Sequence, residues 1–159
     1  MRTHGKALFL LAMMSTAAHA GVLLDKTDRF RETRAVVWNS IPDNDREFAL
    51  SALAFYPKGA ASPSSYTFTL TTYSDTGEYA RCHHNAWLID GQRSMELESS
   101  YENSPQASVV IERFTSKVSR EVLERVAAAK LVEFKICGTE GAISAADIDG
   151  VRQVLDATK

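Results

Sequence analysis

The chain has few of the residues that mark fibrous, disordered or disulfide-rich proteins. Its 159 residues include only 8 Gly, 4 Pro and 2 Cys. Collagen-like and low-complexity sequences need far more Gly and Pro, and small disulfide scaffolds need far more Cys. With 45% hydrophobic and 24% charged residues, the chain has the composition of one globular domain. A domain of this size buries roughly two thirds of the surface that its unfolded chain exposes.

Local catalytic and cofactor motifs are also missing. The sequence contains no G-x-S-x-G, H-E-x-x-H, C-x-x-C, P-loop or G-x-G-x-x-G pattern. These patterns place a nucleophile, a metal ligand, a redox dithiol or a phosphate-binding backbone at a fixed spacing. We therefore expect no cofactor, and we favour a binding role over catalysis. Catalytic groups can still converge from distant strands without a local motif.

The longest apolar run is too short to span a membrane and is typical of an export signal. Residues 1–20 begin with two cations, continue with an apolar run over 7–14, and end with Ala18-His19-Ala20. A transmembrane helix needs about 20 apolar residues, whereas a short apolar run followed by small residues is the pattern that signal peptidase cuts. We expect cleavage near Ala20 and a single exported domain over 21–159, periplasmic or secreted.

The net charge makes nucleic acid and membrane surfaces unfavourable partners. Residues 1–20 contain two basic and no acidic residues, so their removal leaves 16 basic and 20 acidic side chains and a net charge of −4. Such a chain has no broad basic surface to neutralise phosphates or anionic lipids. Its densest basic segment, with Arg29, Arg31 and Arg34, is interleaved with acidic residues. That segment is expected to be solvated and of mixed charge.

Cys82 and Cys137 are the only cysteines, and we expect them to form a disulfide after export. In the chain-entropy treatment, closing a loop of this length adds about 4 kcal/mol to the free energy of unfolding. The alternative is a metal site, because Cys82 and His84 would project from the same face of a strand. Two ligands leave a tetrahedral zinc ion two ligands short, so the disulfide is the preferred interpretation.

Turn-forming clusters divide the chain into short segments rich in β-branched and aromatic residues, which predicts antiparallel strands. Helical spacing of apolar residues starts only after Ser119 and after Ser144, each a good N-cap, with an alternating segment over 132–137 between them. The predicted fold class is α+β. An antiparallel sheet of about six to eight strands, meander-like or sandwich-like, is followed by a C-terminal helix-strand-helix segment packed on the sheet.

One predicted strand is apolar on both faces. The stripe of Phe48, Leu50 and Ala52 has one parity, and Leu53 and Phe55 have the other. In antiparallel sheets one face is commonly solvated and polar. We therefore expect this strand to be covered on both sides.

Asp90-Gly91 predicts a β-hairpin with a two-residue type I′ turn, because both residues tolerate positive φ. Continued along both strands, this register places His83 opposite Glu98 and puts Trp87 on the face away from Met95. A three-residue loop would slip the pairing by one residue and place Trp87 opposite Met95. The tighter turn is preferred because Asp-Gly suits it.

Trp87, His83 and Glu98 form the candidate binding surface, since exposed aromatic patches mark partner sites. The competing interpretation places Trp87 in a second core layer beneath a C-terminal helix. A small exported chain without catalytic motifs is most simply a non-enzymatic binding module. Its partner would be another exported protein, to which it would be an inhibitor or an immunity-like protein.

Two alternatives remain open. In a hydrolase, Glu98 would orient His83 as the general base for Ser99 or Ser100. The same histidine and glutamate equally make an ordinary cross-strand charge pair, so no residue is assigned as catalytic. In a metal-binding protein, Cys82 and His84 would be the ligands.

Overall fold

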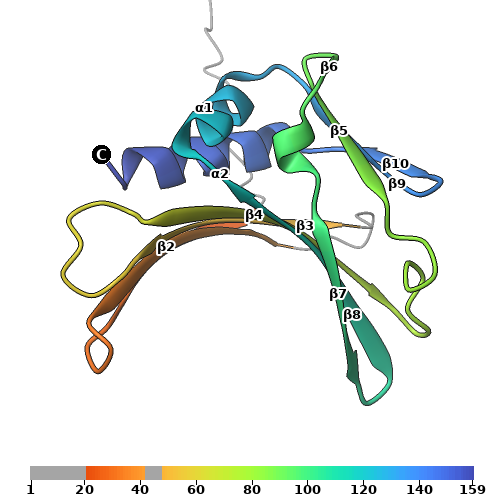
Figure 1. The fold of residues 1–159 in the computed structure, drawn as a ribbon, viewed down its shortest axis with the longest axis horizontal. Coiled ribbons are helices and arrows are strands. Elements are labelled where there is room, and N and C mark those ends of the chain that lie inside the picture. The colour runs from red at the N-terminus through yellow and green to blue at the C-terminus, as the bar shows by residue number, and fades with distance from the viewer. Residues whose placement is uncertain (1–20, 42–47) are drawn as a thin grey trace, which may run out of the picture.

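The computed structural model describes residues 21–41 and 48–159. The expected leader at 1–20 lies outside the described residues. Ten strands form two antiparallel sheets in the described part of the chain, and two α-helices pack with them (Figure 1).

The larger sheet has six strands, in the order β1 (Gly21–Asp28), β2 (Thr33–Ser40), β3 (Ala49–Tyr56), β4 (Ser65–Ser74), β8 (Val109–Val118) and β7 (Ser100–Gln106). The smaller sheet has four strands, in the order β10 (Thr139–Ala142), β9 (Val132–Ile136), β5 (Asn85–Ile89) and β6 (Gln92–Arg93). The helices are α1 (Arg120–Ala128) and α2 (Ala145–Asp156), and a short 3₁₀ turn, η1, spans Met95–Leu97.

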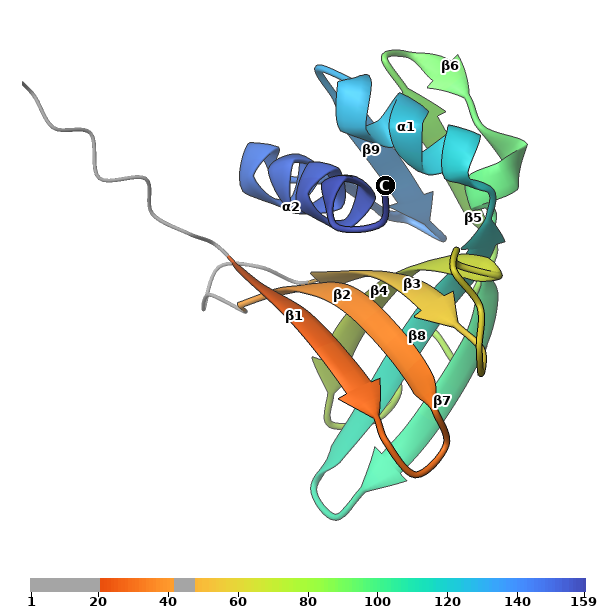
Figure 2. The ribbon, with the colours of Figure 1, turned by 90° about the vertical axis from the view of Figure 1, so that its left-hand side faces the viewer.

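Both helices and the smaller sheet lie on the same side of the larger sheet (Figures 1 and 2). Alternate residues of β2, β3, β4 and β8 are buried beneath them. The core has two parts. Between the sheets it is aromatic, with Phe68, Trp87, Phe114 and Phe134. Beneath the helices, aliphatic side chains of α2 cover β1, β2 and β3 of the larger sheet, and α1 packs against α2.

The helix starts follow the sequence. Ser119 and Ser144 are the N-caps of α1 and α2, and their hydroxyls accept the backbone N–H groups of Val122 and Asp147. Such caps satisfy amide donors that have no partner within the helix. Asp147 itself is buried, and its carboxylate accepts the indole N–H of Trp38 (3.1 Å). The start of α2 is thereby fixed to β2.

The α+β class is confirmed, whereas the strand count and the C-terminal arrangement differ from the prediction. The predicted helix-strand-helix segment contains an additional strand, β10, because Cys137 and Gly138 form a two-residue turn between Ile136 and Thr139. Cys137 occupies the left-handed region at φ +55°. β9 pairs with β5 and β10 in a second sheet, and does not join the larger sheet.

The two-residue turn at Asp90-Gly91 is confirmed. Ile89 pairs with Gln92, and both turn residues have positive φ, +48° and +78°. The continuation of the register is wrong, because the ladder of β6 ends at Arg93 and the chain enters η1. This 3₁₀ turn buries Leu97 completely, and burial of that side chain outweighs further pairing with β5.

No helix within residues 21–41 and 48–159 is long and apolar enough to cross a lipid bilayer.

Candidate functional site

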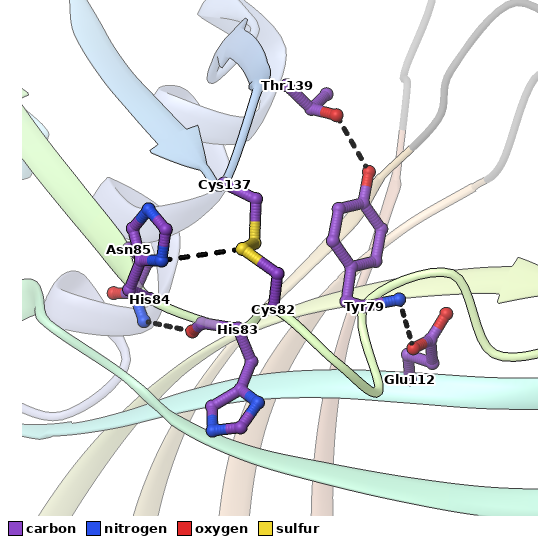
Figure 3. The surroundings of a disulfide bond; sticks show 8 residues. All are labelled: Tyr79, Cys82, His83, His84, Asn85, Glu112, Cys137 and Thr139. Atoms are coloured by element: carbon purple, nitrogen blue, oxygen red, sulfur yellow. Dashed lines mark hydrogen bonds between the residues drawn. A yellow bond between two sulfur atoms is a disulfide. The ribbon is translucent and has the colours of Figure 1, made fainter.

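The predicted disulfide between Cys82 and Cys137 is present and joins the segment before β5 to the β9–β10 turn (Figure 3). Two other contacts connect the same parts of the chain. The backbone N–H of Cys137 donates to the carbonyl of His84 (3.0 Å), and the hydroxyl of Tyr79 donates to Oγ1 of Thr139 (3.0 Å). The disulfide therefore lies within an already hydrogen-bonded junction.

The start of this segment is held by a buried carboxylate, Glu112 of β8, which is 0% exposed. It accepts hydrogen bonds from the backbone N–H groups of Glu78 and Tyr79 (2.8 Å each), from Ser74 Oγ (3.1 Å) and from the hydroxyl of Tyr101 (2.7 Å). A carboxylate has about four acceptor positions, so these donors occupy it. Glu112 is thus a structural anchor rather than a free acid or base.

Tyr101 connects this anchor to His83. Burial, and then the hydrogen bond to Glu112, raise the pKa of the Tyr101 phenol above its ordinary value of 10.0. On its other side the phenol ring stacks on the imidazole of His83, with ring centroids 4.9 Å apart and planes 10° from parallel. His83 is exposed and packs by this stacking contact.

His83 and Glu98 do not form the pair that the hydrolase hypothesis needs. The carboxylate of Glu98 instead pairs with Arg93 (2.8 Å), and no hydrogen bond joins it to His83 within the described residues. The candidate nucleophiles also have other partners. The hydroxyl of Ser99 donates to the carbonyl of Leu97 (3.1 Å), and that of Ser100 donates to a backbone carbonyl of β8 (3.0 Å).

Trp87 lies in the core and is only 1% exposed. Its indole meets the ring of Phe68 edge to face, with centroids 5.6 Å apart, and lies 5.4 Å from the ring of Phe134. Trp87 therefore lies in a second core layer, as the competing interpretation proposed. The element that covers it is the larger sheet and not a helix. Of the three candidate surface residues, only His83 and Glu98 are exposed.

The structure adds a third ligand to the candidate metal pair. Sγ of Cys82, Sγ of Cys137 and a ring nitrogen of His84 all lie within 4.8 Å of one another. Nδ1 of His84 is 3.4 Å from Sγ of Cys82. In the disulfide state the two sulfurs are bonded to each other. Sequence spacing alone does not reveal Cys137 as a neighbour of His84, because the β9–β10 turn brings it there.

The clearest unassigned surface is the face of the larger sheet that points away from the helices. We use the term open face for its apolar part, on β1–β3, made by Leu24, Ala35, Val37, Leu53 and Phe55. Leu24, Val37 and Leu53 are direct neighbours across three strands, and Ala35 pairs with Phe55 in an adjacent row. These side chains are half-buried by their neighbours. Both helices and the smaller sheet lie on the opposite side of the larger sheet (Figure 2).

Phe30 is an aromatic residue that projects from the edge of this sheet. Phe30 lies in the turn between β1 and β2 and is 99% exposed. The turn is ordered by Asp28, whose carboxylate accepts the backbone N–H groups of Phe30 and Arg31 (2.9 and 3.1 Å). An ion pair between Glu32 and Lys58 (3.0 Å) ties it to the β3–β4 loop. The phenyl ring is thus presented on a fixed backbone.

Two concavities of the described surface contain charged side chains that already have partners. One, of about 430 Å³, lies between the β1–β2 turn and the β3–β4 loop and includes Arg34 and Tyr56. Arg34 is already paired with Asp25 (2.7 Å) and lies 4.7 Å from the Tyr56 ring centre. The other, of about 290 Å³, is beside β10 and includes Asp147, which already accepts the Trp38 indole N–H. Neither concavity contains a histidine.

Comparisons with known proteins leave the geometry as the basis for a function. The chain matches no protein-family model, no curated protein and no solved structure.

Proposed function

We propose that the chain is an exported, non-enzymatic binding protein that docks another exported protein through its open face. The observation that carries this proposal is the row of Leu24, Val37 and Leu53, which lie side by side on the sheet face opposite the two helices and the smaller sheet. Contiguous apolar surface of this kind marks interaction sites on proteins that are otherwise well packed.

The sequence pattern of β3 supports a partner that covers the open face. The apolar residues Leu53 and Phe55 predict that β3 is packed on both faces, and in the structure one face is packed and the other is the open face. Burial of a half-exposed aliphatic or aromatic side chain in an interface contributes about 25 cal/mol per Å² of apolar surface removed from water. A protein partner supplies this burial.

The charges beside the open face indicate the chemistry of the partner. Lys26 of β1 and Lys117 of β8 are exposed on the same side of the sheet. Lys117 pairs with Thr67, which pairs with Leu53, so this lysine lies at the end of the row that begins with Leu24. Arg31 is exposed in the turn beside Phe30. A complementary surface would have an apolar centre and an acidic rim, because such complementarity favours association of the correct partner.

Phe30 is suited to act as an anchor at the end of this surface. Aromatic side chains that fill a pocket of the partner contribute a large share of binding free energy. Because Asp28 and Lys58 already order the turn, little backbone entropy is lost when Phe30 is bound, which favours affinity.

An exported location fits the disulfide, since stable disulfides form in oxidising compartments. A binding role also agrees with the arrangement of the polar groups. Glu98, Ser99 and Ser100, which the hydrolase hypothesis names, have other partners, and the buried carboxylate Glu112 is occupied by four donors.

Photocrosslinking in the native host tests the proposal. A photoreactive amino acid is placed at Leu53 on the open face, at Phe30, and, as a matched control, at Glu133 on the outward face of the smaller sheet. We expect the first two positions to give one adduct of the same mass, and Glu133 to give none. Equal labelling from all three positions, or no adduct from Leu53, would overturn the proposal. An adduct of twice the chain mass would identify a second copy and would also overturn it.

With the partner identified, affinity measurements complete the test. Leu53→Gln and Phe30→Ser are each expected to weaken binding by about tenfold or more, because a hot-spot side chain contributes more than about 1.4 kcal/mol. The melting temperature of Phe30→Ser should equal that of the parent chain, because the side chain is 99% exposed. Unchanged affinity in both variants would contradict the assignment of the open face.

A further inference from the structure

We propose that the reduced chain contains a zinc-type metal site formed by Cys82, Cys137 and His84. The three residues come from two parts of the chain, the segment before β5 and the β9–β10 turn, and their side chains meet at one point (Figure 3). This inference goes beyond partner binding by the open face, and it concerns a different region of the molecule.

The spacing of the ligand atoms suits a tetrahedral ion. With zinc–sulfur bonds of about 2.3 Å and zinc–nitrogen bonds of about 2.0–2.1 Å, a sulfur and a nitrogen ligand lie about 3.6 Å apart. Sγ of Cys82 and Nδ1 of His84 are already 3.4 Å apart. Two thiolates on one zinc ion lie about 3.8 Å apart. The Cα atoms of Cys82 and Cys137 are 6.0 Å apart, so side-chain rotation is sufficient to reach this separation.

The fold holds the ligands together without the sulfur–sulfur bond. The backbone N–H of Cys137 donates to the carbonyl of His84 (3.0 Å), and Tyr79 donates to Thr139 (3.0 Å). Immediately after His84, β5 begins its pairing with β9, with Asn85 opposite Ile136. These contacts remain when the disulfide is reduced. The three ligands therefore stay close, which lowers the entropic cost of assembling a metal site.

A dithiol reductant can convert the disulfide into the metal-binding form. Such a reductant gives two electrons and two protons to the bond between Cys82 and Cys137, forms two thiols, and becomes a disulfide itself. A Zn²⁺ ion then replaces one proton on each thiol, and neutral His84 donates its Nδ1 lone pair. The two thiolates cancel the charge of the ion. Three protein ligands leave a fourth position for water or a further ligand, as in zinc sites that are not closed.

The site is accessible and redox-dependent. His84 is exposed and both cysteines are half-buried, so a reductant and a metal ion can reach them. In the disulfide state neither sulfur is a thiolate, and a thiolate is the form that binds the metal. Metal binding is therefore expected only after reduction.

Metal titration of the purified chain tests this inference. The chain is reduced with a phosphine, freed of reductant, and titrated with Zn²⁺ against a chromophoric chelator and with Co²⁺ by absorption spectroscopy. We expect one ion per chain, a thiolate-to-cobalt charge-transfer band, and release of two protons for each zinc ion bound. Zinc should also raise the melting temperature of the reduced chain, because an ion that binds only the folded state stabilises it.

The two neighbouring histidines provide a matched pair of variants. In the reduced chain His84→Ala should weaken zinc binding by about tenfold or more, since even a group that only supports a ligand is worth about tenfold. His83→Ala should leave it unchanged, because His83 stacks on Tyr101 and lies outside the cluster. Equal loss in both variants overturns the inference. So does zinc binding by the oxidised chain that equals binding by the reduced chain, or a reduced chain whose melting temperature does not respond to zinc.

Discussion

The indole of Trp38 lies directly against the backbone of Gly150, so that a Cβ atom at position 150 would be 2.2 Å from two ring carbons. Both residues are buried, and the indole N–H is bonded to Asp147 one turn earlier on α2. The ring therefore has no room to move away. This contact explains a glycine inside a helix, where it costs about 1 kcal/mol relative to alanine.

The first prediction concerns this contact. Gly150→Ala should lower the free energy of unfolding by about 1–3 kcal/mol through overpacking, although alanine is the better helix former. Urea denaturation measures the change. Gly138→Ala is the matched control, because nothing lies within 4 Å of a Cβ at that position, and it should be nearly neutral. A stabilised Gly150→Ala variant would contradict the packing argument.

A second prediction concerns Asp90, which has a role beyond its turn. Its carboxylate accepts the backbone N–H groups of Lys130 and Leu131 (2.9 Å each), and the residue has φ +48°. Asp90→Ala loses both hydrogen bonds. Alanine also lacks the short polar side chain that makes the left-handed region tolerable, so we expect the free energy of unfolding to fall by about 2 kcal/mol or more. Asp90→Asn keeps an acceptor oxygen and tolerates this φ, and should lose less than half as much. Equal losses in thermal or urea unfolding would refute this explanation.

The third prediction is a pH dependence at Tyr101. Its pKa is raised in the folded chain, by burial and by Glu112, so the folded state binds the phenolic proton more tightly than the unfolded state. Its contribution to stability is fully present below pH 10 and is lost as the pH rises through the folded pKa. The difference in unfolding free energy between the parent chain and Tyr101→Phe should therefore shrink above pH 10. If this difference in unfolding free energy stays constant from pH 8 to pH 11, the predicted pH dependence at Tyr101 is wrong.

The fourth prediction concerns the disulfide. Cys82→Ser combined with Cys137→Ser frees a loop with a sequence separation of 55 and should lower the free energy of unfolding by about 4 kcal/mol in the chain-entropy treatment. The urea dependence should steepen, because the unfolded chain is less compact without the cross-link. Reduction of the parent chain should give the same shift, and the double variant should not respond to reductant. A loss below about 1 kcal/mol would show that the cross-link restricts the unfolded state little.

Local signals in the sequence predicted local structure well. The turn at Asp90-Gly91, the caps Ser119 and Ser144 and the cysteine pair depend on short-range geometry or on compartment, and all are present in the structure. The α+β class also followed from the change from alternating to helical spacing.

Features that depend on packing between distant segments were missed. The chain leaves the ladder after Arg93 because Leu97 finds a buried position, and no local pattern distinguishes that outcome from a longer strand. For Trp87 the sequence offered burial in a second core layer as one interpretation, but it did not reveal Phe68, 19 positions earlier in the chain, as the neighbour that buries it. The sequence indicated the open face in part, because Leu53 is apolar on the strand face that is commonly polar when only one face of a strand is packed.

The two tryptophans divide the core between them. Trp38 lies under α2, whereas Trp87 lies between the two sheets. Each indole thus emits from a separate half of the interior. In the single-tryptophan variants Trp38→Phe and Trp87→Phe, the fluorescence of the remaining indole reports the unfolding of its own half. Coincident melting curves would mean that both halves collapse as one cooperative unit, and separated curves would reveal which half comes apart first.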